Sequence, residues 1–162
     1  MILDPRVADA ITGHLPKELA AFAAYRTLAS WAQAAGYLGS ARWFDAAGSE
    51  EPEHHRKLLQ YLRDTTDAPP APAYPALEVD FPIARLPDAY ALAGALERDV
   101  RLSLQAIVGV ARAADDEATA RFIGTFLDEQ VTAEAEIADI LRQIGRLGDD
   151  ALMLWDGERG EA

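Results

Sequence analysis

Prolines divide this chain more sharply than any other residue type. Six of the nine prolines lie within the stretch 65–87, and proline lacks the backbone N–H that a helix interior needs. On either side of this stretch the chain is rich in Ala, Leu, Glu and Arg, which favour helices. No alternation of β-branched residues indicates a strand. The sequence therefore predicts an all-α protein with one long connection in its middle.

Start and stop signals predict two long helices before that connection. Asp4 followed by Pro5 opens the first helix, and the apolar pattern continues until Gly36. Ser40 is expected to cap a second helix that ends near Arg63. The link between these two helices is short, so we expect them to run antiparallel.

Two further long helices are expected after the connection. Asp88 is expected to cap the third and Asp115 or Asp116 the fourth, and the apolar cluster 152–155 predicts one short helix in the tail. Links that are short, long and short allow the second and third helices to run in parallel. We therefore expect residues 1–162 to form a single domain, an up-down four-helix bundle with one long crossover between helices two and three.

The composition limits the chemistry that the chain can perform. It contains 27 acidic residues against 15 Lys and Arg, a net charge of −12, which argues against binding nucleic acid or an anionic membrane and favours cations. It has no Cys, so a metal would need carboxylates and His as ligands. No segment resembles a signal peptide or a membrane span of about 20 apolar residues. We expect a cytoplasmic protein.

A polar residue interrupts the apolar seam of each predicted long helix near its middle. These residues are Glu18, Glu51 with His54, Glu97 and Gln130, and no Lys or Arg occupies the same seam positions. An unpaired carboxylate in a core would stay protonated or cost several kcal/mol. Two divalent cations would compensate this set. The strongest single element is Glu51-x-x-His54, whose side chains project from one helix face.

With these residues in place, the sequence resembles the bacterial non-haem ferritins, which are iron-storage proteins of the ferritin-like superfamily. The segments that carry the resemblance cover almost the whole chain: KELAAFAAYRTLASW, EEPEHHRKLLQYL, ALERD, FLDEQV and IGRLGDD. The resemblance implies that Glu18, Glu51 and His54 hold a first iron. It also implies that Glu51 bridges to a second iron, which Glu97 holds and beside which Gln130 lies.

The resemblance further implies an activity and an assembly. Fe²⁺ would bind as a pair, be oxidised by oxygen or peroxide, and be stored as mineral inside a hollow homo-oligomer of twenty-four subunits. Tyr25 lies seven residues after Glu18 on the same face and matches a tyrosine that hydrogen-bonds near the di-iron centre in this family. A role as an aromatic residue of the core fits Tyr25 equally well.

The sequence differs from bacterioferritins and rubrerythrins at positions that bind metal or haem in those proteins. The fourth helix has Gln130 and Ala133 where bacterioferritins and rubrerythrins have a second Glu-x-x-His, and Pro52 stands where a bacterioferritin has its haem-ligating Met. No haem is therefore expected. A further iron site of bacterial members is matched by Glu50 and Glu129 but not at positions 132 and 133. Both matching residues fit solvated surface positions equally well.

Two other functions remain compatible with the sequence. One is a di-iron or di-manganese oxidase that uses the same ligands on an organic substrate and stores nothing. The other is a metal-free structural bundle whose seam carboxylates are protonated or hydrogen-bonded. The first predicts a small oligomer with a substrate pocket, and the second predicts no metal in the purified protein.

Two prolines and two histidines near the predicted ligands carry further expectations. We expect both helices to continue through Pro16 and Pro52 but to kink there, with Gly13 and Gly48 loosening the preceding turns. Alternatively, the first long helix begins at Pro16. His14 and His55 are expected to be exposed.

Overall fold

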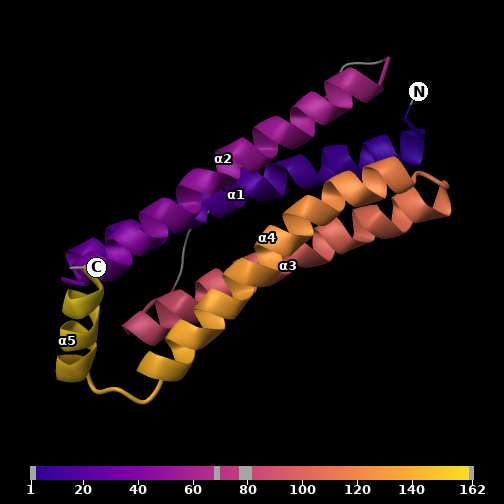
Figure 1. The fold of residues 1–162 in the computed structure, drawn as a ribbon. Helices are drawn as coiled ribbons and strands as arrows, with labels where there is room; N and C mark the ends of the chain where they lie inside the picture. The colour runs from indigo at the N-terminus through magenta and orange to yellow at the C-terminus, as the bar shows by residue number, and fades with distance from the viewer. Residues whose placement is uncertain (1–2, 68–69, 77–81, 161–162) are drawn as a thin grey trace.

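The computed structural model describes residues 3–67, 70–76 and 82–160, and within them it contains helices but no strand. Four long helices, α1 (Pro5–Ala34), α2 (Leu38–Thr65), α3 (Leu86–Ala113) and α4 (Glu117–Ile144), form a bundle, and a short helix, α5 (Asp149–Gly160), crosses one end of it (Figure 1). The predicted all-α fold with a short C-terminal helix is confirmed. None of these helices is both long and apolar enough to cross a membrane.

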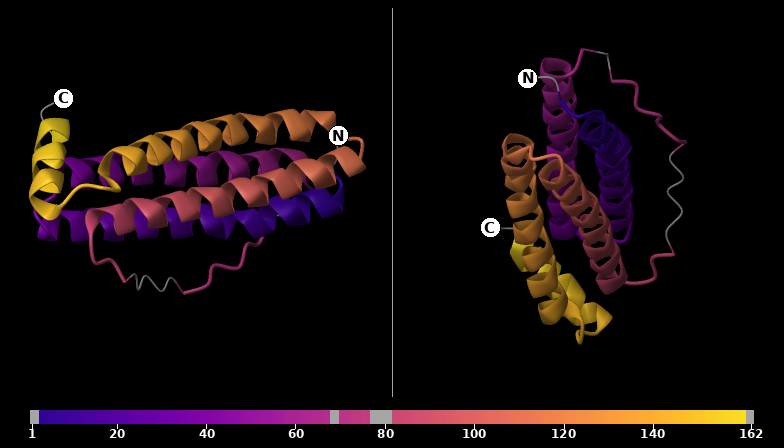
Figure 2. Two further views of the ribbon diagram at one scale, coloured as in Figure 1. Left: turned by 90° about the horizontal axis from the view of Figure 1, so that it is seen from below. Right: turned by 90° about the vertical axis from the view of Figure 1, so that its right-hand side faces the viewer.

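The long helices associate as two hairpins. α1 packs along α2, α3 packs along α4, and α1 also contacts α3, whereas the backbones of α2 and α4 have few close contacts. The described parts of the connection after α2, residues 70–76 and 82–85, lie along the outside of the bundle, and α3 begins at the end of the bundle opposite to the one where α2 ends (Figure 2). α2 and α3 therefore run in the same direction, which confirms the predicted topology with one crossover.

Local signals explain where α1 and α4 begin. The Asp4 carboxylate accepts a hydrogen bond from the Arg6 backbone N–H (2.8 Å), and Pro5 occupies the first helical position, where the missing N–H costs nothing. Asp116 caps α4 by accepting a hydrogen bond from the Thr119 backbone N–H (2.9 Å). Both starts agree with the sequence prediction.

The predicted caps at Ser40 and Asp88 are wrong, because each helix begins two residues earlier. The Ser40 hydroxyl donates a hydrogen bond to Asp156 of α5 (2.5 Å) instead of accepting one from the start of its own helix. The Asp88 carboxylate reaches back and accepts a hydrogen bond from the Arg85 backbone N–H (2.8 Å). Asp88 thus stabilises the start of α3 from inside its first turn.

The core consists of two apolar clusters with a polar layer between them. One cluster packs around Tyr25, Phe44 and Tyr90 at the end of the bundle near α5, and the other packs around Ile11 and Leu104 towards the opposite end. Most residues of the apolar seam, which recur at steps of three and four along one face of each long helix, are buried. The two clusters supply the apolar burial that stabilises the fold. The layer between them contains the predicted ligands.

Both internal prolines lie within continuous helices. α1 continues through Pro16 and α2 through Pro52, so the alternative that the first long helix begins at Pro16 is wrong. The expected kinks stay a prediction. Gly48 also has a packing role, because a Cβ atom there would lie 2.6 Å from the Cβ of Tyr25. Glycine therefore allows α1 and α2 to approach closely beside the polar layer.

Candidate metal centre

Four helices bring the five predicted ligands together in the polar layer. α1 supplies Glu18, α2 supplies Glu51 and His54, α3 supplies Glu97 and α4 supplies Gln130. The exposed fractions of these residues lie between 1% and 6%. Each residue occupies the apolar seam of its helix, so the packing that buries the seam also turns these polar groups inward. We call these five residues the central cluster.

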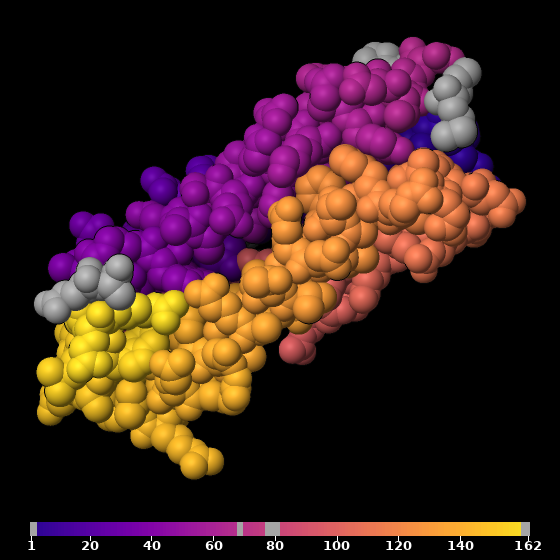
Figure 3. Space-filling model, viewed as in Figure 1, coloured from indigo at the N-terminus to yellow at the C-terminus, as the bar shows by residue number. Residues whose placement is uncertain are grey.

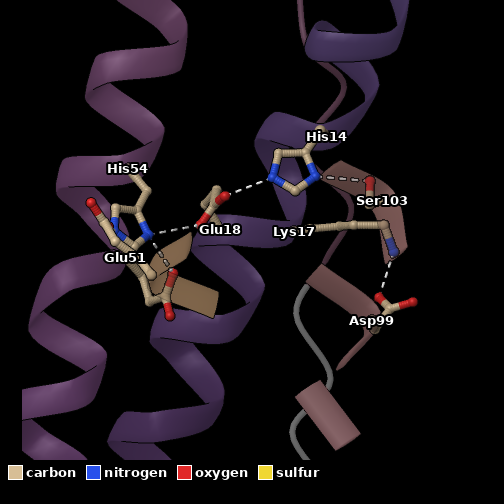
Figure 4. Close-up of polar contacts among 8 residues, drawn as sticks. His14, Lys17, Glu18, Glu51, His54, Asp99 and Ser103 are labelled. Carbon is tan, nitrogen blue, oxygen red and sulfur yellow. Dashed lines mark hydrogen bonds and ion pairs between the residues drawn. The ribbon is translucent and has the colours of Figure 1, made fainter. Parts of the chain in front are cut away.

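Glu18, Glu51 and His54 form the tightest part of the central cluster. One ligand atom from each lies within 4.8 Å of the other two. The His54 Nδ1 atom is 3.5 Å from Glu18 Oε2 and 3.3 Å from Glu51 Oε2, and Figure 4 shows the three side chains turned toward one another. A single cation between these atoms could contact two anionic oxygens and one imidazole nitrogen.

Glu97 and Gln130 face the same layer from the other hairpin. The Tyr25 hydroxyl donates a hydrogen bond to Glu97 Oε1. Burial raises the pKa of Glu97, against the lowering effect of hydrogen bonds from Tyr25 and Gln130. Tyr25 is therefore both a core aromatic and a direct partner of a predicted ligand, so the two roles left open by the sequence coexist.

Four buried oxygen atoms in this layer have no hydrogen-bond partner, and they are the only side-chain atoms of this kind among the described residues. They are Glu18 Oε2, Glu51 Oε2, Glu97 Oε2 and Gln130 Oε1, one from each long helix. Buried polar atoms are nearly always satisfied, because an unmade hydrogen bond costs about 1–3 kcal/mol. Oxygen ligands with one imidazole suit a divalent metal such as iron or manganese. The donor set therefore fits a divalent metal, with Glu18, Glu51 and His54 as the candidate site.

The charges of the central cluster are strongly coupled. Burial raises the pKa of Glu51, and the neighbouring carboxylates Glu18 and Glu97 raise it further. Burial also raises the pKa of Glu18, but the hydrogen bond from His14 and the nearby His54 imidazole outweigh this and lower it. Burial disfavours the charged form of His54, yet Glu18 and Glu51 raise its pKa to about 10. Glu18 and Glu51 therefore share one nearby positive charge, that of the His54 imidazolium.

A cavity of about 380 Å³ opens from the central cluster between α2 and α4, and the space-filling view shows a hollow between these helices (Figure 3). Its lining includes Glu50, Glu129 and Glu136, and no Lys or Arg. Glu129 accepts a hydrogen bond from His54 Nε2 (2.8 Å). Thr132 and Ala133 also line the cavity. These are the two positions at which the sequence lacks the carboxylates of the further iron site.

The expectation that His14 is exposed is wrong. His14 is 1% exposed, and its Nε2 atom lies 2.6 Å from Glu18 Oε1. The signal for this contact was present in the sequence, because His14 precedes Glu18 by four residues and so shares its helix face. His55 is half-buried, and its Nε2 atom lies 2.7 Å from the hydroxyl of Tyr74 in the long connection.

Known proteins resemble this chain over nearly its full length. The family model of the ferritin-like domain matches residues 8–147. Bacterial non-heme ferritins from Staphylococcus aureus (strain MRSA252) and Staphylococcus saprophyticus are 29% and 28% identical, over 98% and 95% of this chain and 96% and 91% of theirs. An open pore ferritin from the archaeon Archaeoglobus fulgidus has the same fold, with a TM-score of 0.84 at 23% identity, covering 99% of this chain and 98% of that one.

The family match includes every residue of the central cluster. Glu18 lies near the start of the matched range and Gln130 near its end, so all four helices that supply the cluster are included. The fold agrees independently with that of a solved ferritin. The chain belongs to the family of proteins with a ferritin-like domain.

Proposed function

We propose that this chain is the subunit of an iron-storage ferritin and that the central cluster is its di-iron ferroxidase centre. Two Fe²⁺ ions bind there as substrates and are oxidised to Fe³⁺. The observation that carries the proposal is the set of four buried oxygens without hydrogen-bond partners, one from each long helix. The names of the curated relatives, bacterial non-heme ferritins, support it.

The geometry suggests how the ligands divide between the two ions. Glu18 and His54 would hold the first Fe²⁺, because their free atoms face each other. Glu51 would bridge the two ions, since its carboxylate lies beside His54 and interacts electrostatically with both Glu18 and Glu97. Glu97 and Gln130 would hold the second ion through their unpartnered oxygens.

The chemistry requires one electron from each Fe²⁺. A pair supplies the two electrons that, with two protons, reduce O₂ to H₂O₂, or that reduce H₂O₂ to water. Carboxylates are hard anionic ligands that stabilise Fe³⁺ relative to Fe²⁺. The Tyr25 hydroxyl holds one oxygen of Glu97, and Glu129 holds Nε2 of His54. These contacts orient the ligands and leave His54 Nδ1 to bind metal.

The cavity between α2 and α4 provides a route for iron. Its lining carries the exposed carboxylates Glu50, Glu129 and Glu136 and no Lys or Arg, so its outer part attracts cations, and its one imidazole, His54, belongs to the proposed ligands. Glu50 and Glu129 would guide iron on its way, and a strong third iron site is not expected without carboxylates at 132 and 133. This lining favours iron transit over an organic substrate.

The proposal includes a hollow shell of twenty-four chains in the cytoplasm, with the mineral inside. A net charge of −12 per chain suits a compartment that collects cations. Storage without an enclosed volume would leave Fe³⁺ to precipitate in solution. The assembly is therefore as necessary to the function as the ferroxidase centre.

Anaerobic loading with Fe²⁺ followed by air tests the proposal. Stopped-flow absorbance should show a fast oxidation phase that saturates at two Fe²⁺ per chain, and excess iron should sediment together with a particle of twenty-four chains. Oxidation by a small oligomer without co-sedimenting iron would favour the oxidase that stores nothing. A protein that binds no iron would favour the metal-free bundle.

A further inference from the structure

His14 occupies a buried position behind Glu18, on the side away from His54. Its Nε2 atom lies 2.6 Å from Glu18 Oε1, and its Nδ1 atom lies 2.8 Å from the hydroxyl oxygen of Ser103 on α3. Figure 4 shows the three side chains in a row that leads from α3 into the central cluster. Neither His14 nor Ser103 belongs to the proposed ligand set.

The chemistry of the three groups determines the direction of both hydrogen bonds. An ionised carboxylate can only accept, so His14 Nε2 carries a hydrogen and donates a hydrogen bond to Glu18. In the neutral ring Nδ1 is then an acceptor, so the Ser103 hydroxyl donates to it. The Glu18 carboxylate thereby selects the tautomer of His14, and Ser103 supports that tautomer through its hydrogen bond with Nδ1.

This arrangement leaves Glu18 with a single oxygen for metal. Oε1 is held by His14, whereas Oε2 has no hydrogen bond and lies 3.5 Å from His54 Nδ1. We propose that His14, supported by Ser103, is a positioning residue that makes Glu18 a one-oxygen ligand directed at the first metal. The inference rests on the proposed function.

The burial of Glu18 explains why such a partner is needed. The Glu18 side chain is 1% exposed, so water cannot satisfy Oε1, and an apolar residue at position 14 would leave that oxygen unpaired. The carboxylate would then be free to rotate away from the metal. Partners of this kind typically contribute about 10- to 100-fold in metal affinity.

Titration of the full-length protein with Co²⁺, followed by visible absorption, tests the inference. For His14→Leu we expect the dissociation constant of the first Co²⁺ to rise about 10- to 100-fold and the cobalt spectrum to change. His14→Gln should restore the wild-type behaviour, because an amide can donate to Glu18 and accept from Ser103. Ser103→Ala should give a smaller loss, of about 10-fold or less.

Lys17→Ala is the matched control. Lys17 also connects α1 to α3, through an exposed ion pair with Asp99 (2.5 Å) in which Glu18 takes no part. Its cobalt affinity should equal that of the wild type. Thermal unfolding followed by circular dichroism compares the stability of all variants. If His14→Leu does not fold, Ser103→Ala and His14→Gln still carry the test.

The outcomes separate this inference from the proposed function. If the wild type binds no Co²⁺, the proposed metal centre is wrong and the role of His14 is overturned with it. If wild type and folded His14→Leu bind Co²⁺ equally, only the role of His14 is overturned. Weaker binding by His14→Gln to the same degree as by His14→Leu would also overturn it, because hydrogen bonding would then not be the cause.

Discussion

Buried carboxylates occur in two regions of the bundle, the central cluster and Asp156 near its end. Asp156 is 2% exposed, and both of its oxygens accept hydrogen bonds, from the backbone N–H groups of Gly39 (2.8 Å) and Ser40 (2.7 Å) and from the Ser40 hydroxyl (2.5 Å). In the central cluster, each of the three glutamates keeps one oxygen without a hydrogen-bond partner.

The difference shows how the same chemical group serves two purposes. Asp156 lies at the N-terminus of α2, where free N–H groups and the helix dipole stabilise a negative charge. α2 has no capping side chain of its own, so α5 supplies the cap. The carboxylates of the central cluster lie in the middle of long helices, where no backbone N–H is free. In the proposed function, a bound cation satisfies their free oxygens.

The largest expected effect is that of Glu51→Ala on iron oxidation. Removing the bridging carboxylate should slow rapid Fe²⁺ oxidation by at least about 100-fold, as measured by stopped-flow absorbance. The fold should stay intact, because the mutation removes a buried oxygen that has no hydrogen-bond partner. Glu53→Ala, an exposed residue of the same helix that pairs with Arg56, is the control. Unchanged initial rates in Glu51→Ala would contradict the bridging role.

Asp156→Ala should lower the stability of the fold and leave iron oxidation unchanged, the reverse of Glu51→Ala. It leaves three donors at the start of α2 without their acceptor, so we expect a loss of about 2–4 kcal/mol in the free energy of unfolding, measured by urea denaturation. The initial rate of Fe²⁺ oxidation in the folded protein should stay at the wild-type value. Glu158→Ala, exposed on the same helix, should change neither quantity. A fall in the oxidation rate of Asp156→Ala without a loss of stability would contradict the role of Asp156 as a helix cap.

Glu97→Ala should separate the two halves of the central cluster. If Glu97 holds chiefly the second metal, as proposed, titration with Zn²⁺ should show about one equivalent fewer per chain, while Glu18 and His54 should still bind the first ion. Calorimetry measures both the stoichiometry and the remaining affinity. The control is Asp99→Ala, an exposed residue two positions after Glu97 on α3 that points away from the seam. Loss of both equivalents would show that the two metals cannot be separated in this way.

A smaller effect is expected from pH. Glu18 and Glu51 hold the pKa of His54 at about 10, and burial raises the pKa of Glu51, so both groups carry protons at neutral pH in the metal-free protein. Metal must displace these protons. Affinity for Zn²⁺ should therefore rise from about pH 6 to about pH 8. Calorimetry in two buffers of different ionisation enthalpy should reveal about one or two protons released per chain, and identical heats would contradict this.

The sequence by itself determined the helices, their faces and the composition of the central cluster. Apolar residues at steps of three and four define one buried face per helix, so the burial of Glu18, Glu97 and Gln130 followed from their place in that pattern. The proline-rich connection determined the topology, because a long link is needed to bring the second and third helices into parallel. These signals are local and can be read without a structure.

Only the tertiary structure decided which polar groups meet across the helices. Ser40 looked like a helix cap, but its partner, Asp156, lies more than a hundred positions away on α5. His14 looked like a surface residue until its contacts with Glu18 and with Ser103 of α3 were known. A helical pattern gives the direction of a side chain relative to its own helix axis. The pattern does not identify which residue of another helix packs against that side chain. This neighbouring residue decides whether a buried carboxylate has a hydrogen-bond partner or is free to bind a metal.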